Sequence, residues 1–298
     1  MTRSNPLAWG ALMVVPAIAA LVYLWASHSP FVMSGLLTLV AVAILTPVAL
    51  WLLPAQYALP AIDVPRPRRE SAVLLTYVLL WALLFIGWFL YALPAYIPDG
   101  RERFVVKLLL KLLTMVVLPS AALIAAGGAV RDHWRGRFDL RRFWLPLVVL
   151  GSAVVAGAFA DPTAARPSNI PPAQFWFIAP LTFLWIGIEA GLCEEYLFRA
   201  CLQTRLAAWL KSDVAAVSLT ALIFGLIHFP GFAFHQPPPG APGGFNLETL
   251  SYCLVSVAPM GVLFGVIWVR TRNLWLCVAI HALADIPLMA VMKTVWFS

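Results

Sequence analysis

Apolar residues run along this chain in long blocks separated by short polar connections. At 1.5 Å per residue, about 20 apolar residues cross the roughly 30 Å hydrocarbon core of a bilayer as a helix. Blocks near this length predict transmembrane helices at Leu7–Ala26, Phe31–Pro54, Ala72–Pro94, Val105–Val130, Trp144–Ala160, Phe175–Trp209, Val214–Phe229, Thr249–Val269 and Leu274–Trp296. We therefore predict an all-α fold, a polytopic transmembrane helical bundle of about eight to nine spans.

Composition supports this prediction. Of the 298 residues, 62% are hydrophobic and only 11% are charged, an apolar excess far beyond what a soluble core needs. The net charge is +7, but the basic residues lie in the short connections, where membrane topology places them. This distribution indicates a lipid bilayer as the environment and no nucleic-acid partner.

The basic connections also predict an orientation. Three arginines lie in 66–69, five lie in 131–142, and the pairs Arg205 with Lys211 and Arg270 with Arg272 fall on that same side. The positive-inside rule then places the N-terminus in the cytoplasm. We expect an integral multi-pass protein of the bacterial inner (cell) membrane.

Some polar or irregular features receive a structural interpretation. Lys107 and Lys111 lie near a span end, where long side chains can snorkel to the interface. Cys193, Cys201, Cys253 and Cys277 lie in apolar stretches without metal-site spacing, so we interpret them as buried thiols. The segment from Pro230 to Asn246 is rich in Pro and Gly and is predicted to be neither helix nor strand, acting either as an inert linker or as a mobile gate.

Candidate functional residues cluster in the stretch from Glu189 to Arg199, which places three carboxylates and a guanidinium inside an apolar block. Such placement costs about 2.5 to 3.5 kcal/mol per charge near the bilayer centre, so these residues are functional candidates. Glu195 and Arg199 are four residues apart and can pair on one helical face. Glu194 points about 100° away and has no partner within the motif.

Two further motifs with polar residues follow, each with four-residue spacing: Phe224 with His228, and His281 with Asp285. Counted from the predicted membrane edge at 1.5 Å per residue, Glu194, His228 and His281 lie about 16, 18 and 12 Å deep. We therefore expect Glu194, His228, His281 and Asp285 to line one pocket near the bilayer centre.

This set of groups suits hydrolysis of an amide bond. A carboxylate can act as general base for water, and a nearby imidazole can share the proton or stabilise the developing oxyanion. Arg199 would then hold Glu195 rather than contact substrate. Two histidines with one or two carboxylates, from His228, His281, Glu194 and Asp285, also form a zinc-like ligand set. The residues alone leave both mechanisms open.

The motifs Glu194-Glu195-x-x-x-Arg199, Phe224-x-x-x-His228 and His281-x-x-x-Asp285 resemble the CAAX protease and bacteriocin-processing (CPBP, or Abi) family, which includes the type II CAAX prenyl endopeptidases. The similarity covers roughly Ala173 to Ile286. It divides the chain into N-terminal transmembrane helices without a recognised motif (1–172) and a CPBP-like catalytic helical core (173–298).

The resemblance implies an intramembrane endopeptidase in which Glu194 activates water, His228 assists it, and His281 with residue 285 stabilises the oxyanion. Glu195 and Arg199 match supporting positions. Family members are described both as glutamic proteases and as metalloproteases. The last motif often ends in Asn, whose amide donates a hydrogen bond, whereas Asp285 can donate only when protonated.

We therefore predict an intramembrane protease that hydrolyses a peptide bond of a membrane-associated protein or peptide, by a glutamic or a metal-dependent mechanism. A divalent metal, zinc above all, is the one candidate cofactor. Two alternatives stand beside this prediction: a catalytically silent scaffold or partner-binding member of the same fold, and a proton-coupled transporter. The absence of repeat symmetry argues against the transporter.

Overall fold

The computed structural model describes residues 6–97, 100–161, 170–234, 241–289 and 292–293. All regular structure within these ranges is helical. The α-helices are α1 (Pro6–Ala26), α2 (Val32–Leu52), α3 (Pro67–Trp81), α4 (Leu90–Tyr96), α5 (Gly100–Leu112), α6 (Leu118–Ala125), α7 (Leu145–Ala160), α8 (Pro172–Ile186), α9 (Cys193–Glu195), α10 (Thr204–Leu210), α11 (Asp213–Phe234), α12 (Leu247–Tyr252), α13 (Ala258–Thr271) and α14 (Leu274–Ala284).

Several of these helices join through π-helical stretches into longer continuous spans. Eight helices in the described part of the chain are long and apolar enough to cross a membrane. They are Leu7–Ala26, Val32–Leu52, Pro67–Ile86, Gly100–Ala125, Leu140–Ala160, Ala173–Leu210, Asp213–Phe234 and Leu247–Thr271. The predicted all-α polytopic bundle is confirmed.

The last predicted span, Leu274–Trp296, is interrupted within the described residues, and residues 290–291 and 294–298 lie outside them. Its helix, α14, has 11 residues and ends at Ala284. A short 3₁₀ turn, Ile286–Leu288, follows it. Pro287 lacks the amide hydrogen that a continuing α-helix would need, which explains the early end. The helix is therefore too short to cross the bilayer unaided.

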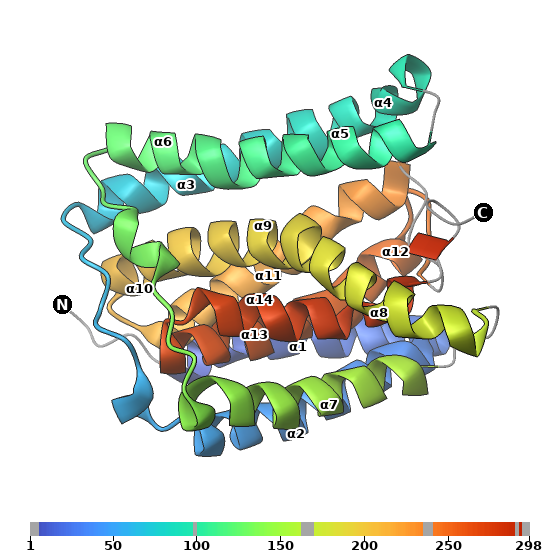
Figure 1. Cartoon of the computed structure of the whole chain (residues 1–298), viewed down its shortest axis with the longest axis horizontal. Helices are drawn as coiled ribbons and strands as arrows, with labels where there is room; N and C mark the ends of the chain where they lie inside the picture. The colour runs from blue at the N-terminus through green and yellow to red at the C-terminus, as the bar shows by residue number, and fades with distance from the viewer. Residues whose placement is uncertain (1–5, 98–99, 162–169, 235–240, 290–291, 294–298) are drawn as a thin grey trace.

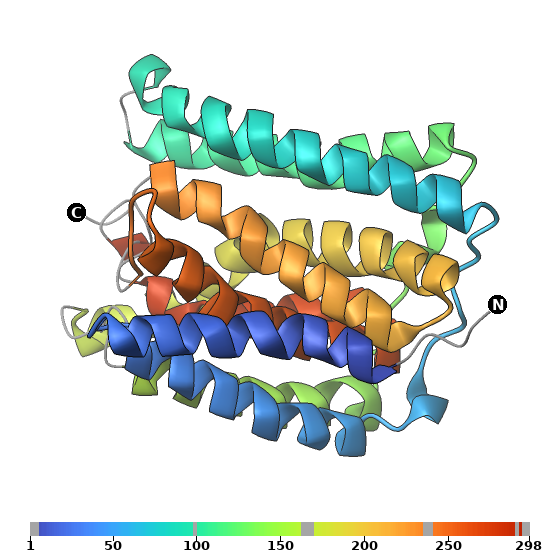
Figure 2. The ribbon, with the colours of Figure 1, turned by 180° about the vertical axis from the view of Figure 1, so that it is seen from behind.

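The helices form three groups in space (Figures 1 and 2). α3 to α6 lie along one edge of the bundle, and α1, α2 and α7 lie along the opposite edge. α8 to α11, α13 and α14 lie between these edges. In the apolar window of Leu247–Thr271, 61% of the residues are buried, against 17% in that of Gly100–Ala125. Together with Asp213–Phe234, at 50%, Leu247–Thr271 therefore forms the interior, and Gly100–Ala125 presents more of its surface outward.

The outer surface carries large apolar side chains. Trp25, Trp51 and Trp176 are 71%, 79% and 79% exposed, and each lies near one end of its helix. Exposed tryptophans at span ends match the aromatic belts found at the lipid headgroup level. The predicted buried thiols are also confirmed, since all four cysteines are free and buried.

Two expectations about the chain are corrected by the structure. The segment from Pro230 was predicted to be neither helix nor strand, but α11 continues through Pro230 to Phe234, so the segment begins as helix. Residues 235–240, at the centre of the predicted linker or gate, lie outside the described residues. Arg205 was expected to be a charge of a cytoplasmic connection, but its side chain is fully buried.

Candidate active site

The first acidic motif lies on a continuous helix whose geometry changes around it. The short segment α9, which carries Glu194 and Glu195, lies between the π-helical stretches Gly187–Leu192 and Tyr196–Gln203. π-helical turns are rare and frequently mark functional sites. The two adjacent glutamates diverge: Glu194 lines a cavity, whereas Glu195 is completely buried.

Glu195 connects two of the predicted motifs. Its Oε2 lies 3.2 Å from Nε of Arg199, which confirms the predicted pairing across one helical turn. Its Oε1 lies 2.7 Å from Nδ1 of His281 on α14. Because a carboxylate accepts hydrogen bonds, Nδ1 is the donor in this contact, which leaves Nε2 of His281 directed elsewhere. Glu195 therefore fixes the orientation of the imidazole.

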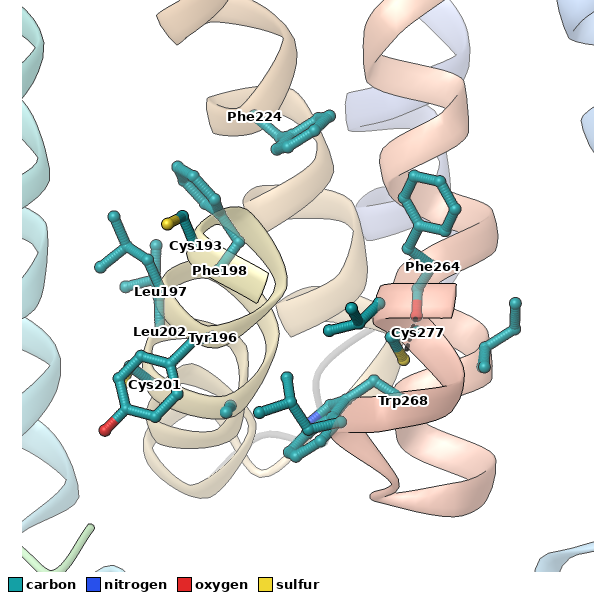
Figure 3. Close-up of a cluster of buried hydrophobic side chains, with 14 of the residues drawn as sticks. Cys193, Tyr196, Leu197, Phe198, Cys201, Leu202, Phe224, Phe264, Trp268 and Cys277 are labelled. Carbon is teal, nitrogen blue, oxygen red and sulfur yellow. Dashed lines mark hydrogen bonds between the residues drawn. The ribbon is translucent and has the colours of Figure 1, made fainter. Parts of the chain in front are cut away.

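Two aromatic side chains, Phe224 and Phe264, contact Arg199 and His281. The guanidinium carbon of Arg199 lies 4.7 Å from the ring centre of Phe224 and 5.6 Å from that of Phe264. The ring of Phe264 also stacks on His281, with centroids 4.8 Å apart and planes inclined by 6°. Phe224 and Phe264 come from different helices and belong to the apolar cluster drawn in Figure 3. Cation–π contacts thus stand in for hydrogen bonds around the buried Arg199 guanidinium, and ring stacking holds His281.

Glu194 faces both histidines. Its Oε2 lies 3.9 Å from Nε2 of His228 and 3.8 Å from Nε2 of His281. Nδ1 of His228 lies 2.7 Å from the carbonyl oxygen of Phe224, so this nitrogen donates to the backbone and Nε2 faces the carboxylate. The structure thus brings Glu194, His228 and His281 together from three separate helices, at distances too long for direct hydrogen bonds.

A close helix approach makes this convergence possible. A Cβ atom added at Gly191 would lie 2.9 Å from the backbone oxygen of Val278. Real Cβ contacts essentially never come that close. Glycine at this position therefore lets α14 lie directly against the helix that carries Glu194, which brings His281 within reach.

Asp285 lies at the edge of this group. Its Oδ2 is 3.5 Å from Nε2 of His281, one helical turn earlier, as the spacing predicts. Its side chain is 37% exposed, so it is the most open of the four predicted site residues that line the cavity. Asp285 therefore contacts the imidazole rather than Glu194.

Glu194, which has no partner within its own motif, finds one on another helix. Its Oε1 lies 3.2 Å from Nζ of Lys111. The same Nζ is 3.0 Å from Oε1 of Glu189, which also contacts Lys107 at 3.4 Å. The Lys111 side chain is only 13% exposed, so this lysine does not snorkel to the interface as expected. Two lysines one turn apart within an apolar block were the available signal for this contact.

The cavity above Glu194 has a volume of about 310 Å³. Its wall includes side chains from the region without a motif (1–172), among them Ser34 and Asp161, together with Tyr252. Ser34 Oγ lies 2.5 Å from Oδ2 of Asp161. No local pattern marks these residues, because only tertiary packing brings them to the site.

The predicted ligand set was tested against the arrangement of donors. Among the residues that the structure describes, no group of three or more His, Cys, Asp or Glu side chains is arranged to hold a metal ion. One oxygen of Glu194 is also occupied by the ammonium group of Lys111. The arrangement therefore gives the metal alternative no support, and metal dependence stays a prediction.

Comparison with known proteins identifies the region that carries this site. No curated protein and no solved structure matches the chain. Residues 174–287 match the family described as type II CAAX prenyl endopeptidase Rce1-like. The matched region contains Glu194, Glu195, Arg199, His228, His281 and Asp285, and it supports a function of the intramembrane endopeptidase kind. This domain lies inside a bundle of membrane-spanning helices, and the match supports a CAAX protease (CPBP) family assignment for residues 174–287.

Proposed function

We propose that this protein hydrolyses a peptide bond of a membrane-associated protein or peptide by a glutamic mechanism. The observation that carries the proposal is the meeting of Glu194 Oε2 with Nε2 of both His228 and His281 beside a cavity within the membrane-spanning bundle. The separations of 3.8 and 3.9 Å leave no direct hydrogen bond and bring all three atoms within reach of one water molecule.

In this mechanism Glu194 accepts a proton from the water molecule while the water oxygen attacks the peptide carbonyl carbon. The new C–O bond places negative charge on the carbonyl oxygen, which Nε2–H of His228 or His281 stabilises when that imidazole carries both ring protons, since Nδ1 of each ring already donates elsewhere. Glu194 then delivers its proton to the amide nitrogen as the C–N bond breaks, giving an acid and an amine. Glu195 holds His281 in place throughout.

Orientation in the membrane forms part of the same proposal. The connections rich in arginine, before α3 and between α6 and α7, lie at the same end of the bundle as the turn between α13 and α14 (Figure 1). Basic residues collect on the cytoplasmic side of membrane proteins. This arrangement supports a cytoplasmic N-terminus in a bacterial cell membrane.

The test is an assay of purified protein against membrane-anchored peptides, each prepared with and without a prenyl group, with Glu194→Gln as the blank. Cleavage by the wild type but not by the variant supports the proposal. Each reaction is repeated after chelation, and loss of cleavage that zinc restores would replace the glutamic mechanism by the metal-dependent one. Cleavage of no peptide by the wild type would favour the silent scaffold.

A further inference from the structure

Lys111 brings a positive charge into the site from a span outside the matched region. It lies in the last turn of α5, whereas the matched region begins at residue 174. Its ammonium group bridges two carboxylates, at 3.0 Å from Glu189 and 3.2 Å from Glu194. Its side chain and that of Glu194 are 13% and 10% exposed, so solvent screens this contact weakly.

The contact distinguishes the two oxygens of Glu194. Oε1 faces Lys111, while Oε2 faces the two histidines. A carboxylate held at one oxygen by a charge-assisted hydrogen bond loses rotational freedom about its terminal torsion. Oε2 is then presented to the cavity in one fixed direction, which is the geometry that a general base needs before substrate arrives.

We infer that Lys111 is a positioning residue for Glu194, acting through Oε1 to keep Oε2 directed at the water. This inference rests on the proposed role of Glu194 as the base. It extends the site beyond the matched region, because α5 supplies the group that orients the base.

The competing role for Lys111 is neutralisation of Glu189. Glu189 also contacts Lys107 at 3.4 Å, and the Lys107 side chain is 43% exposed. If Lys111 serves only Glu189, removing the charge of Glu189 should make Lys111 dispensable. If Lys111 positions Glu194, removing Lys111 should lower kcat even when residue 189 is neutral.

The experiment compares five variants in detergent: Lys111→Met, Lys111→Arg, the double variant Lys111→Met with Glu189→Gln, the control Lys107→Met, and the blank Glu194→Gln. Turnover (kcat), KM and melting temperature are measured for each. We expect Lys111→Met to lower kcat about 10- to 100-fold, the scale of one lost hydrogen bond to a charged group. KM should stay unchanged because Lys111 lies behind Glu194 rather than in the cavity wall.

Lys111→Arg should recover most of this turnover, because it restores a cation to the same place. Lys107→Met should turn over like the wild type. The double variant should stay slow while melting like the wild type, and it remains informative even if Lys111→Met alone fails to fold. Wild-type turnover by the double variant, with Glu194→Gln inactive, would overturn the inference and leave the proposed function intact. Full activity in Glu194→Gln would instead refute the proposed function and, with it, the inference.

Discussion

The helical span that carries Glu194 also carries the buried charge of Arg205, and the two are surrounded very differently. Nε of Arg205 lies 3.2 Å from Oε2 of Glu70. Its two terminal nitrogens reach the backbone oxygens of Ala200 and Ala129 and Nε2 of His133, at 2.5 to 3.1 Å. Every nitrogen of this guanidinium is therefore satisfied.

Glu194, by contrast, has one close partner, Lys111, and faces the histidines across 3.8 to 3.9 Å beside a cavity. Arg205 is enclosed by direct hydrogen bonds, because unmet buried groups cost stability. Glu194 keeps one oxygen open toward the cavity, as its proposed role as a base requires. The comparison supports a structural role for Arg205 and a chemical one for Glu194.

Exchanging Glu194 for Gln should produce the largest effect on activity. The amide keeps the shape but cannot accept the proton, so turnover should fall by a factor of about 10² to 10⁴. The melting temperature should stay close to that of the wild type. Assays and thermal melts on the same preparation would check both, and retained turnover would remove Glu194 from the mechanism.

Exchanging Glu70 for Gln should do the opposite. The change leaves Arg205 as a buried charge without a carboxylate, and breaking such a pair costs about 3–5 kcal/mol. The melting temperature in detergent should fall, while the fraction that remains folded should keep its specific activity. Asp132→Asn is the matched control, because the Asp132–Arg135 pair is partly exposed and should contribute at most about 1 kcal/mol. An equal effect of both variants would contradict the role of Arg205.

Arg199→Ala should have an intermediate effect. Glu195 loses its cation but keeps the hydrogen bond from His281, so the expected loss of stability is about 1–3 kcal/mol. Thermal melting measures it. Arg199→Lys keeps the charge but not the planar group that lies over Phe224, and should fall between the wild type and Ala. An unchanged melting temperature in Arg199→Ala would show that this pair does not support the fold.

His133 should make stability depend on pH. Burial, and then the charge of Arg205, lower the pKa of His133 from 6.5 to about 3. The unfolded chain therefore binds a proton that the folded chain refuses as the pH falls below about 6.5. Between pH 7 and pH 5 the folded state should lose about 2 kcal/mol from this residue. His133→Gln should lose less stability than the wild type over that interval, and identical pH slopes would contradict the assignment.

Asp285→Asn should have the smallest effect. Asp285 is partly exposed and, among the catalytic candidates, contacts only Nε2 of His281. An amide can make the same contact, so kcat/KM should change little, whereas Asp285→Ala should lower it. A large loss in Asp285→Asn together with chelator sensitivity would indicate that the carboxylate binds a metal ion.

The sequence predicted what local pattern determines. Spans follow from apolar length, and the pairing of Glu195 with Arg199 follows from helical periodicity. The convergence of Glu194, His228 and His281 followed from their similar depth. Each of these predictions depends only on the spacing of residues within one helix, or on their depth in the membrane.

The remaining features needed tertiary packing. The contacts Lys111–Glu194 and Arg205–Glu70 join residues 83 and 135 positions apart. Basic residues in apolar blocks have two possible environments, the interface and a buried acid, and periodicity does not distinguish them. Ser34 and Asp161 joined the cavity wall for the same reason, since no motif marks the spans from which they come.

The shortness of α14 has a consequence for how the enzyme is made. This helix follows the eight candidate spans found among the described residues, and its 11 residues cover only about half the thickness of the bilayer core. The close approach at Gly191 therefore places His281 beside Glu194 from the last α-helix of the described chain. A chain that is still being made thus lacks one of the candidate catalytic groups until this helix has docked.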